Sequence, residues 1–270
     1  MVHLLNKLDH FRTHKYPKLE QEHCWKVRRM FKIVHRAFQV YLKPSNIVSP
    51  DSNIRNSIDH LQLLQGSVVG HENDSTVSMT INSKDNSFHG RIVIGDEVYH
   101  IDTVEFNSTS HIVSYQPKDV PQNDFGSCNA GENEVFQGRE RIADFVPQPV
   151  PRSVNIGKKC MMATVADYSF YQKWGEHTID VILSVMNDVD AIYKRDIDVS
   201  IGVKYIYIAQ NNDPVISVNQ TVLSNYLASV RTLVENNQLP DFDKNDYCLV
   251  NVLSHTSFQG LLGLANVRYH

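Results

Sequence analysis

The sequence has no apolar run long enough to cross a membrane and only a small excess of charge of one sign. None of its 270 residues lies in a stretch that approaches the ~18 consecutive apolar residues of a spanning helix. The first residues, MVHLLNKLDHFRTHKY, contain no apolar core like that of a secretory signal. The net charge is −4, so we expect neither nucleic acid nor an anionic membrane as the main partner.

The sequence also lacks the common short motifs of enzymes. It contains no G-x-S-x-G elbow, no P-loop and no G-x-G-x-x-G. Two strings come near the helical zinc motif H-E-x-x-H. HENDS at 71–75 has no second histidine, and HFRTH at 10–14 has no glutamate between its histidines. Both are better explained as solvated polar residues, so the motifs alone predict no complete active site.

Cysteine is scarce, and no C-x-x-C pair points to a structural zinc site. The four residues are Cys24, Cys128, Cys160 and Cys248. They allow two disulfides, or one disulfide with free thiols. N-glycosylation sequons begin at Asn73, Asn107 and Asn219. Such tripeptides also arise by chance, so they favour secretion only slightly and composition leaves the compartment open.

Residues 30–120 predict β-structure, preceded by a polar N-terminal arm. Residues 36–43 and 76–83 alternate apolar and polar side chains with a period of two, as half-buried strands do. In residues 91–102, Gly95 and Asp96 separate two alternating runs. This predicts a hairpin, because glycine accepts the positive φ of the turn. We therefore expect a small all-β domain in this half.

A proline-rich linker ends the first half, because X-Pro units such as those of PQPVPRSVNIG disfavour helix. Beyond it the pattern predicts strands at 160–166, 197–209, 246–255 and 260–267. Amphipathic helices are predicted at 178–194 and 220–237. The first of these places apolar side chains on one face and Asp180, Asn187 and Lys194 opposite. Strands that alternate with helices predict a mostly parallel sheet with right-handed crossovers.

The segment CMMATVADYSFYQKWG, residues 160–175, resembles the start of the catalytic domain in the adamalysin-type zinc metalloproteases, the ADAM family. The resemblance continues in NDVDAIY (187–193), DYCLV (246–250) and FQGLLGLANV (258–267). The combination of DYC with LGLA is most similar to the Kuzbanian-like branch, whose members process Notch-type receptors. In the first half, GRIV from residue 90, HIVSY from residue 111 and Cys128 resemble the prodomain of that branch.

This resemblance implies an α+β chain of two domains. Residues 1–157 would be a small all-β prodomain with a polar arm and a proline-rich linker. Residues 158–270 would be the N-terminal part of an α/β metzincin-type domain with a mostly parallel sheet. The implied activity is zinc endopeptidase cleavage of membrane-protein ectodomains, in the secretory pathway or at the cell surface.

The sequence also departs from the pattern of the family. The zinc helix of the family lies beyond the LGLA segment, so we expect this chain to bind no zinc and to be inactive by itself. No signal peptide, membrane span or R-x-x-R convertase box is recognised. The first functional interpretation is therefore a zymogen-like fragment of a sheddase. The alternative is a catalytically inactive, prodomain-like binding protein that inhibits or chaperones full-length metalloprotease relatives. An unrelated adhesion module is disfavoured by the α/β pattern of the second half.

The resemblance assigns roles to individual cysteines, each with a simpler alternative. Cys128 would be the inhibitory cysteine switch, because a thiolate can take the fourth position on zinc. Its alternative is a loop cysteine that is free or paired with Cys24. Cys160 and Cys248 would form a disulfide, and their alternative is two buried thiols.

Two further assignments concern the rim of the expected catalytic domain. Gly263, Leu264 and Ala265 would belong to an edge strand that binds substrate by β-augmentation, and the alternative is an ordinary core strand. Asp167, at the end of a predicted strand, is better explained as a helix N-cap or turn residue than as a ligand at the rim of a site.

Overall fold

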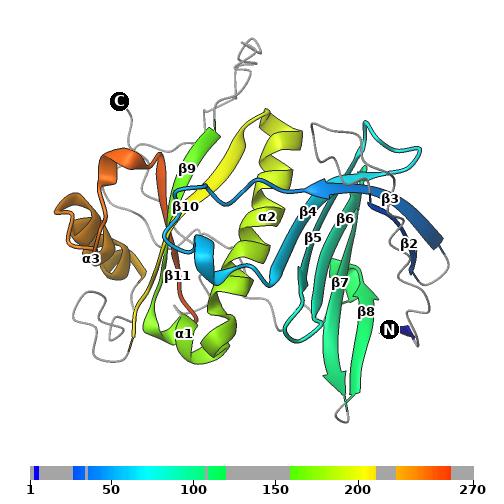
Figure 1. Cartoon of the computed structure of the whole chain (residues 1–270), viewed down its shortest axis with the longest axis horizontal. Helices are drawn as coiled ribbons and strands as arrows, with labels where there is room; N and C mark the ends of the chain where they lie inside the picture. Colours follow the sequence, from blue (N-terminus) through cyan, green and yellow to red (C-terminus); the bar gives the residue numbers. More distant parts are fainter. Residues whose placement is uncertain are drawn as a thin grey trace, which may run out of the picture.

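The computed structural model describes residues 3–5, 27–33, 36–106, 109–119, 159–210 and 223–256. Within these residues, two β-sheets lie on either side of helix α2 (Thr178–Ile197), as Figure 1 shows. Helix α3 (Leu223–Glu235) covers the other face of the smaller sheet. The layers therefore run helix, small sheet, helix, large sheet. Residues 121–157 and 257–270, which include the strand predicted at 260–267, lie outside the described part of the chain.

The large sheet is antiparallel and comes entirely from the first half. Its spatial order is β1-β8-β7-β6-β5-β4-β3-β2. The strands are β1 (His3–Leu5), β2 (Val27–Ile33), β3 (Arg36–Pro44), β4 (Leu61–Val68), β5 (Ser75–Asn82), β6 (Phe88–Ile94), β7 (Glu97–Phe106) and β8 (Thr109–Tyr115). The predicted strands at 36–43 and 76–83 are confirmed. The hairpin is confirmed too, because Gly95 has φ 54° between β6 and β7.

Two strands of this sheet begin where the sequence pattern indicates only a polar arm. Strand β1 pairs with β8, and strand β2 pairs with β3 along its whole length. The charged sequence VRRMFKI of β2 does not alternate apolar and polar residues, so periodicity could not reveal it. The close approach of β4 to β3 requires glycine at position 66, because a Cβ there would lie 1.7 Å from the Tyr41 carbonyl oxygen.

The small sheet comes from the second half and is parallel, with β9 (Lys159–Ala166) between β10 (Ser200–Ile208) and β11 (Leu249–Leu253). The strands and helices predicted at 160–166, 178–194, 197–209, 220–237 and 246–255 are confirmed with small shifts at their ends. A short helix, α1 (Tyr168–Trp174), was not predicted. Short 3-10 turns lie at Arg55–Ser57, Pro117–Asp119, Gly175–His177 and Lys244–Asp246.

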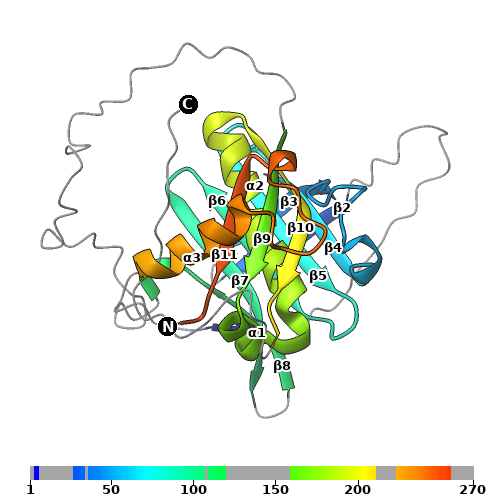
Figure 2. The same cartoon turned by 90° about the vertical axis from the view of Figure 1, so that its left-hand side faces the viewer.

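Strand β9 contributes side chains to two separate apolar cores, because its side chains alternate between the faces of the small sheet. Met162 and Ala166 point to the core beneath α2, whereas Ala163 and Val165 belong to the core beneath α3. Figure 2 shows α3 in front of this sheet. The continuous apolar run of the sequence follows from burial on both faces.

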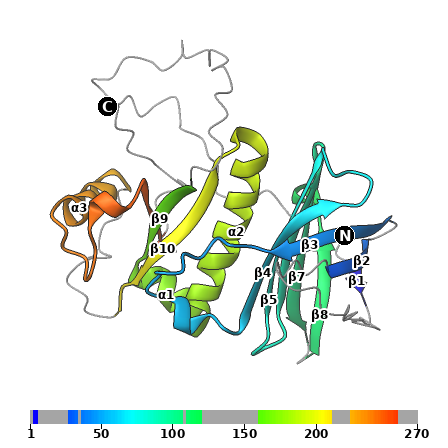
Figure 3. The ribbon, with the colours of Figure 1, turned by 45° about the horizontal axis from the view of Figure 1, so that its top comes forward.

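The core beneath α2 also contains residues of the first half. Ile47, Val48 and Ile54 lie in the connection between β3 and β4, and they pack with Ile182 and Val203 of the second half. Ile47 is fully buried and Val48 is 7% exposed. Figure 3 shows this connection crossing from the large sheet toward the small one. The two halves of the sequence thus share one core.

Candidate functional site

Helix α2 has two buried faces of opposite character. Its apolar face, with Ile182, Leu183 and Met186, packs on the small sheet. The opposite face includes Asn187 and Asp190, both fully buried, and it lies against strands β4 and β5 of the large sheet. Buried polar groups need hydrogen-bond partners, so the contacts of this face decide how the two halves fit together.

The centre of this interface is built on the side-chain amide of Asn187. Its Nδ2 donates to the carbonyl oxygens of Leu64 (3.1 Å) and Met79 (3.3 Å). Its Oδ1 accepts a hydrogen bond from Gln65 Nε2 at 3.1 Å. One residue of α2 is therefore bonded to two neighbouring strands of the large sheet.

A buried carboxylate lies one turn further along α2. Asp190 Oδ2 accepts from Lys194 Nζ at 2.6 Å and from Gln65 Nε2 at 2.8 Å. Its Oδ1 accepts from the Ile201 backbone N–H at 2.7 Å and from Ser200 Oγ at 3.3 Å. These donors compensate for the burial of the charge, and they tie α2 to both sheets.

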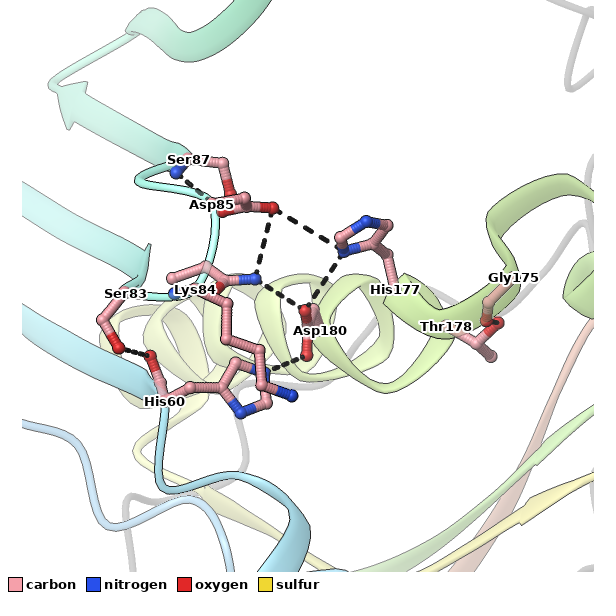
Figure 4. A network of polar contacts seen from close by, with 10 residues as sticks. His60, Ser83, Lys84, Asp85, Ser87, Gly175, His177, Thr178 and Asp180 are labelled. Carbon is pink, nitrogen blue, oxygen red and sulfur yellow. Dashed lines mark hydrogen bonds and ion pairs between the residues drawn. The ribbon is translucent and has the colours of Figure 1, made fainter.

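A cluster of histidines and aspartates lies at the first turn of α2 (Figure 4). Asp180 contacts His60 Nε2 at 3.0 Å and accepts from Asn82 Nδ2 at 2.8 Å. His177 Nδ1 lies 3.5 Å from Asp180 and 3.7 Å from Asp85. Burial raises the pKa of Asp85, but the hydrogen bonds from Ser87 outweigh it and leave that pKa below its usual value. Asp180 lies in the first turn of α2, so the positive end of the helix dipole also stabilises its carboxylate.

A third histidine joins the two halves further along the helix. His89 on β6 contacts Asp102 of β7 through Nδ1 at 2.5 Å and Asp188 of α2 through Nε2 at 3.4 Å. Burial lowers the pKa of His89, but the two carboxylates outweigh it and raise the pKa to about 10. Tyr115 Oη donates to Asp102 at 2.8 Å, and Ser78 Oγ donates to Asp188.

This polar face is the part of the site that the sequence did not reveal. Asp180, Asn187 and Lys194 are indeed opposite the apolar face of α2, but that side is covered by the large sheet. Their partners Gln65 and Asn82 are more than ninety residues away in sequence, so the pattern of the helix gave no sign of them. The only signal in the sequence was an amide, Asn187, close to the carboxylates of Asp188 and Asp190 on a predicted helix.

Cys160 and Cys248 are joined by a disulfide, with their Cα atoms 5.6 Å apart. The bridge links β9 to the residue before β11, and the Cys248 N–H also donates to the Met161 carbonyl at 2.9 Å. Cys24 and Cys128 lie outside the described residues, so the switch assigned to Cys128 stays a prediction.

Asp167 has the N-cap role that the sequence favoured. It is fully buried, and its Oδ1 accepts from the Phe170 N–H at 2.9 Å at the start of α1. Its Oδ2 accepts from Tyr226 Oη of α3 at 3.1 Å. Burial, together with the nearby Asp167 charge, raises the pKa of Tyr226. Asp167 thus holds the two helices to the end of β9.

The remaining predicted sites are only partly covered by the structure. Asn73 is exposed in the turn between β4 and β5, so its glycosylation stays a prediction with an accessible acceptor. His71 is exposed and contacts Asp74 at 3.3 Å, which fits a solvated polar residue. The others lie outside the described residues: Asn107, Asn219, Gly263, Leu264 and Ala265.

Residues 157–269 match the family model described as Metallo-peptidase family M12, of the reprolysin type. The match supports a reprolysin-type metalloprotease. No curated protein matches the chain.

Complete members of this reprolysin-type family use zinc. The described residues of this chain do not fit that metal, because they contain no group of three His, Cys, Asp or Glu side chains that could hold it. In the same residues, no helix is long and apolar enough to cross a membrane.

Proposed function

We propose that this chain is a zymogen-like part of a zinc endopeptidase of the ADAM family, in the Kuzbanian-like branch. Its complete form would shed the ectodomains of membrane proteins such as Notch-type receptors, in the secretory pathway or at the cell surface. The M12 match over residues 157–269 supports the protease half. Three of the segments that resemble the catalytic domain of the family fall on β9 and α1, on α2, and on the start of β11. The fourth, residues 258–267, lies outside the described residues.

The role proposed for the first half is that of an inhibitory prodomain. The observation that carries it is the contact of the large sheet with the polar face of α2, centred on Asn187. Interfaces rich in hydrogen bonds and charges are typical of partners that later separate, whereas permanent interfaces are more apolar. A prodomain must hold its enzyme and then leave it. The apolar contacts of Ile47, Val48 and Ile54 with the core beneath α2 would hold the two halves together, and the polar contacts of α2 with the large sheet would allow them to separate.

Inhibition is proposed to act mainly through this surface and only in part through Cys128. A single Zn–S contact is exchanged readily with water, whereas a sheet domain can bury on the order of 800 Å² per partner. No catalytic step is assigned to the described residues, because they include no zinc site.

The test is a titration of residues 1–157 against an active reprolysin-type sheddase with a quenched fluorescent peptide. We expect inhibition at micromolar concentration, and a loss of only a few-fold in Cys128→Ala. Ile94→Asp, which places a charge against the core of the large sheet, should abolish inhibition by unfolding the domain. Absence of inhibition by the wild-type fragment would contradict the proposal. Complete loss in Cys128→Ala alone would show that the thiol and not the surface inhibits.

A further inference from the structure

The outer edge of β10 is covered by a segment of the first half. Among the described strands of the small sheet, β10 has β9 as its neighbour on one side, and residues 46–53 of the β3–β4 connection lie along the other side. The Val203 N–H donates to the Ile47 carbonyl at 2.8 Å, and the Ser49 N–H donates to the Val203 carbonyl at 2.9 Å. These bonds are the parallel pairing of a short added strand.

Asn53 extends the pairing with its side chain. Its Nδ2 donates to the Ile206 carbonyl at 2.8 Å, and its Oδ1 accepts from the Ile206 N–H at 3.0 Å. A primary amide offers the same donor and acceptor as a peptide group, so Asn53 satisfies both backbone groups of Ile206. The main-chain pairing ends after Ser49, because the Ser49 carbonyl accepts from the Ser52 N–H at 3.1 Å in a turn that contains Pro50.

Side chains and charges anchor the same segment. Ile47 is fully buried and Val48 is 7% exposed in the core beneath α2. Lys159 Nζ donates to the Asn46 carbonyl at 2.5 Å. Lys204 Nζ lies 3.5 Å from the Asp51 carboxylate. The segment therefore carries backbone, apolar and charged contacts within eight residues.

We propose that the outer edge of β10 is a peptide-docking site and that residues 46–53 are its built-in ligand. The site takes a peptide that pairs with the edge at two adjacent aliphatic residues, turns directly after them, and places an asparagine six positions after the first of them. An unpaired strand edge is a general acceptor for such a peptide, and the buried pair and the amide supply specificity. Whenever residues 46–53 leave, the same edge accepts another segment of this chemistry. The inference goes beyond the proposed function, because it does not depend on the protease assignment.

The experiment uses the full chain and a fluorescent peptide of residues 44–56, PSNIVSPDSNIRN. The variant Ile47→Asp/Asn53→Ala disables the built-in segment, so the peptide should bind to this variant and not to the wild-type chain. A peptide with the same two substitutions is the control and should bind to neither. Fluorescence anisotropy measures the binding. Equal binding to both chains, or no binding to a folded variant, would overturn the proposal.

If the double variant does not fold, hydrogen exchange of the Ile206 amide tests independently whether Asn53 holds the edge of β10. Asn53→Ala alone should speed exchange at Ile206 by about tenfold, because one local hydrogen bond is lost. Asn56→Ala is the matched control: Asn56 is an exposed asparagine three residues further along, and its removal should leave Ile206 unchanged. Equal exchange rates in the two variants would show that Asn53 does not hold this edge.

Discussion

His89 has a carboxylate on each ring nitrogen, one from each half of the chain. Asp102 belongs to the large sheet and Asp188 to α2, so the charged imidazole is bonded across the interface. The side chain is 36% exposed, and solvent screening therefore reduces the strength of both ion pairs. Burial raises the pKa of Asp102, but its bonds with His89 and Tyr115 outweigh this and lower it. The His89 imidazole and its two carboxylates thus make the stability of the interface depend on pH.

We expect His89→Gln to remove an alkaline pH dependence of stability. The pKa of His89 is about 10 in the folded chain and near 6.5 in the unfolded chain. Because the folded pKa is the higher, the stabilisation is complete below pH 6.5 and is lost as the pH rises through 10. The difference in unfolding free energy between wild type and variant, from urea titrations at several pH values, should therefore shrink over this range. Val185→Ala, an exposed residue of α2 without a titratable group, is the control and should give a difference that does not change with pH.

Local residue preferences were predictable, whereas distant pairings were not. Gly95 was assigned to a turn because its neighbours alternate and glycine tolerates positive φ, and both signals lie within a few residues. Asp167 was assigned as a helix N-cap or a turn residue for similar reasons, and it is the N-cap of α1. His89 gave no such signal, because its partners lie 13 and 99 residues away. Only the fold brings these groups together.

At the scale of elements, α2 was predicted with its apolar face but without its second partner. A hydrophobic stripe shows that one side is buried, and it says nothing about whether the polar side meets water or another sheet. Strand β2 and helix α1 were missed because neither shows clear periodicity. Long periodic elements were thus predictable from sequence, and the contacts between the two halves were not.

We expect Asn187→Ala to destabilise the attachment of α2 to the large sheet. The change removes bonds to the Leu64 and Met79 carbonyls and leaves Gln65 with one acceptor fewer in a buried position. Unsatisfied buried groups cost about 1–3 kcal/mol each, so the unfolding free energy should fall by roughly 2–4 kcal/mol. Val185→Ala, on the same helix but 40% exposed, should change it by less than about 0.5 kcal/mol. Similar losses in the two variants would show that the interface amide has no special role.

At the scale of the whole molecule, the boundary predicted near residue 157 separates the two sheets along the chain but does not separate their cores. Ile47, Val48 and Ile54 pack with residues of α2 and β10. The sequence patterns predicted β-structure in the first half and a mostly parallel sheet in the second, because each pattern is local to its half. The shared core could not be predicted, because the sequence around these three apolar residues does not indicate which surface they pack against. The two halves should therefore lose stability together.

The disulfide provides a test of this coupling. Cys160 and Cys248 are 88 residues apart and both lie in the second half. Opening a loop of this length by Cys160→Ser/Cys248→Ser should lower the unfolding free energy by about 4–5 kcal/mol in the chain-entropy model. Because the core is shared, hydrogen exchange should accelerate in β9–β11 and also in residues 45–60 and β4. Cys128→Ser should leave both regions unchanged, since we expect Cys128 to be a free thiol. Acceleration confined to the second half would mean that the large sheet is stable without its partner, and the two halves would then be independent domains.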